Sequence, residues 1–127
     1  MTEIQKGLYE FDPQIYPRKL WVAVTKGTFS DVFDTKIEEL DESCYGCVDY
    51  VHHKERNLGG FLVRYESVDV INAKQITHES VHVASGIYKY IGATHDLDNQ
   101  EPFAYLCGWV AGCIEEVKQK LTENGEH

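Results

Sequence analysis

The chain has 127 residues, of which 43% are hydrophobic, and this length and apolar content suit a single domain with its own core. Its formal net charge of -9 would repel a phosphate backbone, so we expect no direct nucleic-acid partner. No apolar run approaches the roughly 20 residues of a spanning helix, and residues 1–12 lack the apolar stretch of a signal peptide, so we expect no membrane association and a cytoplasmic location.

The amino-terminal third of the chain predicts an arm, a strand and a short helix. Residues 1–19 carry no sustained hydrophobic period, so we expect them to form an arm that lies on the domain. Residues 20–24 are apolar and partly β-branched, which predicts a buried strand. Between Thr28 and Leu40 the apolar residues recur every three or four positions, which predicts a short helix with a charged outer face.

The middle of the chain predicts an antiparallel hairpin. Residues 47–53 alternate between apolar and polar side chains, and residues 60–65 alternate less strictly. Residues 57–60, which lie between the two runs, contain the two glycines that a turn favours.

Two long helices are predicted after the hairpin. The first covers residues 70–91, with Asp69 as its N-cap and Gly92 just past its end. The second covers residues 101–121 and has a proline in its first turn, and residues 122–127 are expected to be a frayed tail. Together these elements predict a single α+β domain over residues 1–127, in which a small antiparallel sheet packs against two long helices.

The cysteines do not form an obvious metal site. Cys44 and Cys47 have C-x-x-C spacing, but Cys107 and Cys113 do not supply the second pair that a zinc knuckle needs. We expect four ordinary thiols, with a redox pair or a minor metal site at Cys44 and Cys47 as the alternatives.

The pattern H-E-x-x-H stands in the first long helix, at His78, Glu79 and His82. Residues four apart share a helix face, so the two imidazoles can be directed at one ion. Zinc accepts such nitrogen ligands at about 2.0–2.1 Å, and Glu79, on the flank of that face, can act as a general base toward a water molecule. The spacing therefore predicts a zinc site between the two helices, with paired surface histidines as the alternative.

A catalytic zinc site usually has a third protein ligand, and two candidates follow downstream. Glu101 begins the second helix, beside small residues that let two helices approach closely, and would complete a set of two histidines and one glutamate. His95, in the connection between the helices, would instead give three histidines. Glu101 can also be explained by a capping box with Asp98, but Pro102 directly after it weakens that explanation.

The run from residue 59 to residue 116 resembles a minimal zincin-like metallopeptidase of the gluzincin type, in which H-E-x-x-H is followed by a glutamate about twenty residues later. The run from Glu101 to Trp109 resembles the helix that carries the glutamate and small residues in short, phage- or mobile-element-like zincins. The resemblance implies a zinc-dependent peptidase that acts on a peptide or protein, with Glu79 as base and Tyr105 as a hydrogen-bond donor to the oxyanion. It also implies that the strand at residues 60–65 is the sheet edge beside the active helix.

Two other classes of protein are consistent with the same residues. One is a binding or structural protein that keeps the metal site without catalysis, and the other is an interaction domain whose histidines hold no metal. The metal itself is also open, because two histidines and a carboxylate accept iron or manganese as well as zinc.

Overall fold

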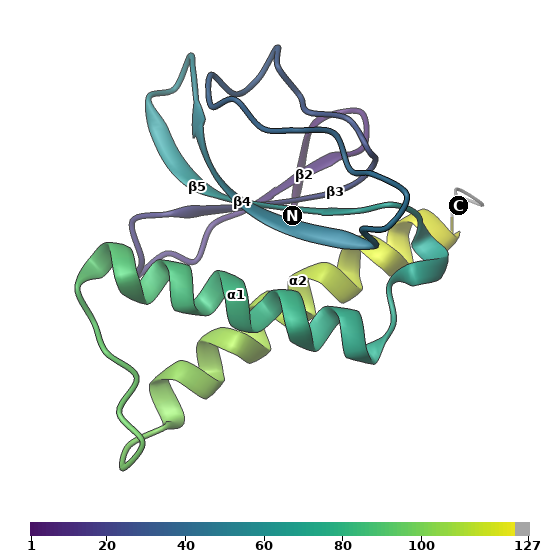
Figure 1. The fold of residues 1–127 in the computed structure, drawn as a ribbon. Coiled ribbons are helices and arrows are strands. Elements are labelled where there is room, and N and C mark those ends of the chain that lie inside the picture. Colours follow the sequence, from purple (N-terminus) through teal and green to yellow (C-terminus); the bar gives the residue numbers. More distant parts are fainter. Residues whose placement is uncertain (124–127) are drawn as a thin grey trace.

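The structure is a computed structural model that describes residues 1–123, and in it two helices cover one face of a five-stranded sheet (Figure 1). The order of the strands across the sheet is β1-β2-β3-β5-β4, so β1 and β4 are its edges. The predicted α+β class is confirmed. Along the chain the elements are β1 (Thr2–Gln5), β2 (Leu8–Phe11), β3 (Lys19–Val24), β4 (Gly46–His53), β5 (Leu58–Tyr65), a 3-10 turn (Val68–Val70), α1 (Ala73–Ile91) and α2 (Glu101–Glu123).

The sheet is mixed, which corrects the prediction of a purely antiparallel one. β4 and β5 form the predicted hairpin, but β5 then runs parallel to β3. β5 is therefore internal, and β4 is the edge, so the strand at residues 60–65 is not the edge that the resemblance implied. Side chains on both faces of β5 are buried, which explains why its apolar residues alternate only weakly.

Residues 1–19 are not an arm. β1 and β2 pair with each other, and β2 pairs with β3, so this segment builds half of the sheet. Leu8 is fully buried and Tyr9 almost so, on opposite faces of β2. Strands of four residues are too short to show a period in the sequence, which is why the prediction failed here.

The predicted helix at residues 28–40 is also wrong. This segment is an irregular loop that covers the sheet face opposite the helices, and Phe33 forms an isolated antiparallel bridge with His53. Phe33 is buried edge-on against Trp21, with ring centroids 4.9 Å apart. The apolar residues that suggested a helix thus serve a second, smaller core, because that face of the sheet must be covered by something.

Both long helices form as predicted, with shifted ends. α1 begins three residues later than expected, and its N-cap is Asn72, whose side chain accepts a hydrogen bond from the Gln75 backbone N–H, in place of Asp69. Gly92 ends α1 in the left-handed conformation, as predicted. α2 starts at Glu101 and continues to Glu123, so residues 122 and 123 belong to the helix, while residues 124–127 of the predicted tail lie outside the described part.

The main core lies between the helices and the sheet. α1 contributes Val83 and Ile87, and α2 contributes Val110 and Ile114, all of which are fully buried. α1 packs beneath β4 and β5, whereas α2 contacts β3. The face of α1 that carries the H-E-x-x-H residues is therefore beside the β4 edge of the sheet.

Candidate metal centre

Two histidines come together on α1 as the spacing predicted. The Nε2 atoms of His78 and His82 lie 3.2 Å apart, and the ring centroids are 4.7 Å apart with the planes at 73°. Two nitrogens bound to one tetrahedral ion at about 2.0–2.1 Å would lie roughly 3.3–3.4 Å from each other. Both rings are exposed. The pair therefore has the nitrogen spacing of two ligands of one cation, and also that of a hydrogen bond between neutral rings.

Glu79 turns from the exposed histidine face toward the sheet and is only 4% exposed. Within residues 1–123 no hydrogen bond or ion pair to its carboxylate is present. Burial raises the pKa of Glu79 above its ordinary value, and the charges of His78 and His82 offset this only in part. A buried carboxylate without a hydrogen bond is a stronger base than a solvated one, which is the property that the predicted role requires.

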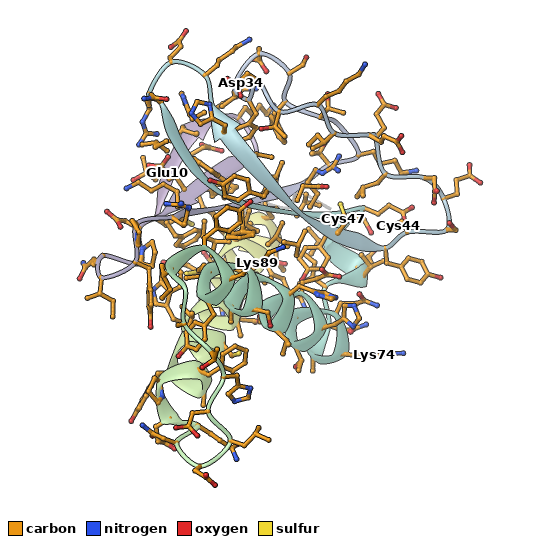
Figure 2. The ribbon with its side chains drawn as sticks, turned by 60° about the vertical axis from the view of Figure 1, so that its left-hand side comes forward. Glu10, Asp34, Cys44, Cys47, Lys74 and Lys89 are labelled. Atoms are coloured by element: carbon orange, nitrogen blue, oxygen red, sulfur yellow. The ribbon has the colours of Figure 1, made fainter. Side chains whose placement is uncertain are left out.

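A hollow of about 400 Å³ lies between α1 and the β4–β5 hairpin. Figure 2 shows Cys47 at the start of β4, with Lys74 and Lys89 near the two ends of α1. Because the hollow is lined by residues of β4, β5 and α1, it lies beside the sheet edge and not between the two helices, where the zinc site was expected. Its lining residues are Gly46, Cys47, Val48, Tyr50, Phe61, His78, Glu79 and His82.

The two candidates for a third ligand lie elsewhere. Glu101 is exposed at the first residue of α2, two residues before Phe103, whose ring meets that of Tyr88 at 5.1 Å. Tyr88 is six residues beyond His82, a rise of about 9 Å along α1. His95 stacks on Phe103 at 4.2 Å. In the described part of the chain no group of three or more His, Cys, Asp or Glu side chains is arranged to hold a metal.

Tyr105, the predicted oxyanion donor, is 76% exposed on α2. It lines a separate, mainly apolar hollow with Trp109 and Ile15, and it is not among the residues around the histidine pair. The structure therefore brings together His78, Glu79 and His82 but leaves Tyr105 and Glu101 apart from them.

Cys44 and Cys47 are free, half-buried thiols near the start of β4 (Figure 2). The Cys47 thiol lies 3.3 Å from an Asp49 carboxylate oxygen, and Arg64 donates a hydrogen bond to its sulfur. Burial raises the pKa of Cys47 to about 12. Cys47 therefore stays a protonated thiol at neutral pH, which disfavours it as a nucleophile.

The part of the hollow that comes from the hairpin was not predicted from the sequence. Val48 and Tyr50 lie on the helix-facing side of β4, and Phe61 lies on the same side of β5. The alternation of β4 was visible in the sequence, but it does not tell which helix the strand faces.

Comparisons with protein-family models, with curated proteins and with solved structures gave no match to this chain. No helix within residues 1–123 combines the length and the apolar character needed to cross a lipid bilayer.

Proposed function

We propose that this protein is a zinc-dependent hydrolase of peptide bonds, in which His78 and His82 bind the metal and Glu79 is the general base. The observation that carries the proposal is the 3.2 Å separation of the two histidine Nε2 atoms beside a buried carboxylate in an open hollow. Imidazole nitrogens are suitable donors for zinc and for iron, so the donor set fits the metal that the sequence pattern implies.

A zinc ion bound there would supply Lewis acidity, which polarises a carbonyl group and makes water more acidic. The chain's own contribution is Glu79. Its carboxylate lines the hollow and has no hydrogen bond within residues 1–123, so it can accept a proton from an attacking water and later give it to the leaving amine. Tyr105 and Glu101 remain proposals from the sequence pattern alone.

The β4 edge supports a peptide as the substrate. The backbone N–H of His52 donates to Thr35, and its carbonyl accepts from the Asp34 N–H, so the outward groups of β4 at this end are occupied. Outward groups recur every second residue, so those of Val48 and Tyr50 face the same side, next to the hollow. No strand of the described chain lies beside them, which leaves room for an extended peptide to pair there.

The alternative of a non-catalytic protein, in which the metal only links the two helices, has less support. His78 and His82 both belong to α1, so an ion held by these two residues links no two elements. The structural alternative would need a ligand from another element, and residues 1–123 bring none to the pair.

The deciding experiment compares wild type, Glu79→Gln and the exposed control Glu55→Gln, each loaded with zinc. We expect wild type and the control to cleave members of a mixed peptide library, and Glu79→Gln to lose at least about 100-fold in rate while keeping its zinc content. Mass spectrometry of the peptides and elemental analysis of the protein give the two readouts. A zinc-loaded wild type that cleaves no peptide would contradict the proposal, and an active Glu79→Gln would contradict the choice of base.

A further inference from the structure

The hollow beside the histidines is lined by ionisable side chains on the side of α1 and mainly by apolar and aromatic side chains on the side of the hairpin. Glu79 and the histidine pair lie toward the amino-terminal half of α1, while Tyr50 and Phe61 line the hollow on the side of the hairpin. Val48 lies between Gly46 and Tyr50 on the same face of β4. A group held at the histidines therefore has an apolar, aromatic surface within reach.

This aromatic surface is held in place by contacts behind it. The ring of Tyr50 stacks on that of Tyr90 from α1, with centroids 4.2 Å apart and planes at 13°. Phe61 meets Tyr50 edge-on at 5.3 Å and Tyr90 at 6.0 Å. The guanidinium of Arg18 lies 5.1 Å from the Tyr90 ring centroid. The Tyr50 and Phe61 rings are thus fixed before any ligand arrives, which reduces the ordering cost of binding against them.

Two glycines make the arrangement possible. A Cβ on Gly59 of β5 would lie 2.1 Å from the Tyr50 hydroxyl, so only glycine lets that side chain lie across β5. A Cβ on Gly86 of α1 would lie 2.4 Å from the Phe61 ring, so only glycine lets α1 approach so closely. The Tyr50 and Phe61 rings therefore occupy space that a side chain at Gly59 or Gly86 would fill.

We propose that the wall formed by Tyr50 and Phe61 binds a large apolar side chain of the substrate, with an aromatic one preferred, a few residues away from the scissile bond. Tyr90, on which Tyr50 stacks, is eight residues beyond His82, a rise of about 12 Å along α1. An aromatic side chain gains both apolar burial and edge-to-face or stacked contacts with these two rings. The inference rests on the proposed function for the cleavage step. The wall itself would select the same side chain in a protein that only binds peptides.

The first test uses wild-type protein loaded with zinc and a set of fluorogenic peptides in which Phe replaces Ala at one position at a time. We expect Phe at one position to raise kcat/KM by about tenfold or more. Tyr50→Leu should lower the ratio of kcat/KM for the Phe peptide to kcat/KM for the all-Ala peptide to about one, and Tyr50→Phe should keep the wild-type ratio. Ile15→Ala, which removes an apolar side chain that is 83% exposed, is the control that should behave as wild type. Equal cleavage of the Phe and Ala peptides by wild type would overturn the inference and leave the hydrolase intact.

The second test separates the two proposals. Glu79→Gln is titrated into the same peptides, labelled for fluorescence polarisation, so that binding is measured without cleavage. At least tenfold tighter binding of one Phe peptide supports the wall even if wild type cleaves nothing. Equal binding of the Phe and Ala peptides overturns it. Thermal unfolding of each Tyr50 variant confirms that the protein being measured is folded.

Discussion

Glu79 is a buried carboxylate in the middle of α1. It is 4% exposed, it lies on a face of α1 that packs on the sheet, and within residues 1–123 it has no hydrogen bond. Burial disfavours the charged form of such a group, and the proposed role as a general base gives a reason for a carboxylate at this place.

Because burial raises the pKa of Glu79, we expect Glu79→Gln to stabilise the metal-free protein at neutral pH. The pKa of Glu79 is raised by burial, so the folded state favours the protonated form. The contribution of Glu79 is therefore most favourable below its unfolded pKa of about 4.5 and is lost as the pH rises through the folded value. Urea unfolding at about pH 4 and pH 7.5 measures this, and the advantage of the variant should be larger at the higher pH.

The same experiment includes its own control. Glu55→Gln changes an exposed carboxylate in the hairpin turn and should leave the difference between the two pH values as in wild type. If Glu79→Gln were equally or less stable than wild type at pH 7.5, a neighbouring group would have to stabilise the charged carboxylate.

At the residue scale the sequence predicted the part of the site that lies within one helix. His78, Glu79 and His82 are fixed relative to each other by helix geometry alone, so their spacing sufficed. Tyr50 and Phe61 could not be assigned, because their place depends on which side of the hairpin faces α1. Long-range pairing of that kind has no local signal in the sequence.

At the scale of elements, the loop at residues 28–40 holds the far end of β4. Figure 2 shows Asp34 near the opposite end of β4 from Cys47. The Asp34 carboxylate lies 3.0 Å from Nδ1 of His52, and the Asn57 side-chain oxygen lies 3.0 Å from Nε2. Both ring nitrogens therefore face acceptors, an arrangement that suits the protonated imidazole. The hydrogen bond to Asp34, followed by that to Asn57, raises the pKa of His52.

This contact predicts a pH-dependent contribution to stability. Because the folded pKa of His52 is raised, the contribution is fully present below the unfolded value of about 6.5 and is lost as the pH rises through the folded value. Asp34→Asn should therefore lower the thermal midpoint more at about pH 5.5 than at about pH 8.5. Asp31→Asn, in the same loop and also exposed, should show no such difference. An equal loss at both pH values for Asp34→Asn would mean that its hydrogen bonds do not depend on the charge of His52.

The same loop explains why one element was predicted wrongly. Its apolar residues recur at helical spacing, yet Phe33 is used to fill the core on the outer face of the sheet. A period of three or four residues in a short segment can thus reflect scattered contacts of an irregular loop. The long segments at α1 and α2 were predicted correctly because their periods extend over five or more turns.

At the scale of the whole molecule, the arrangement of α1 and α2 determines where Glu101 lies relative to His78 and His82. The sequence places Glu101 at the right distance along the chain for a gluzincin-like set, whereas the structure has it exposed at the start of α2. Chain spacing does not fix where two helices cross, because the connection at residues 92–100 can set different positions along α1.

Because Glu101 lies apart from the histidine pair, we expect Glu101→Gln to leave the zinc affinity within about twofold of wild type, whereas His78→Ala, which removes a ligand, should lower it by at least about tenfold. Competition with a chromophoric chelator measures the affinity, with His78→Ala as the positive control and exposed Glu116→Gln, on the same helix, as the negative one. A loss of affinity in Glu101→Gln as large as that in His78→Ala would mean that Glu101 is a ligand of the bound ion, as the sequence pattern predicted.

The half-covered edge of β4 has a consequence for solubility. An uncovered edge strand is a template onto which further chains can add, and an eight-residue edge would invite ordered aggregation. Here the bridge between Phe33 and His53 blocks one end of that template. Another polypeptide can therefore pair with only a few residues of β4. Such short pairing favours reversible binding and disfavours growth into fibrils.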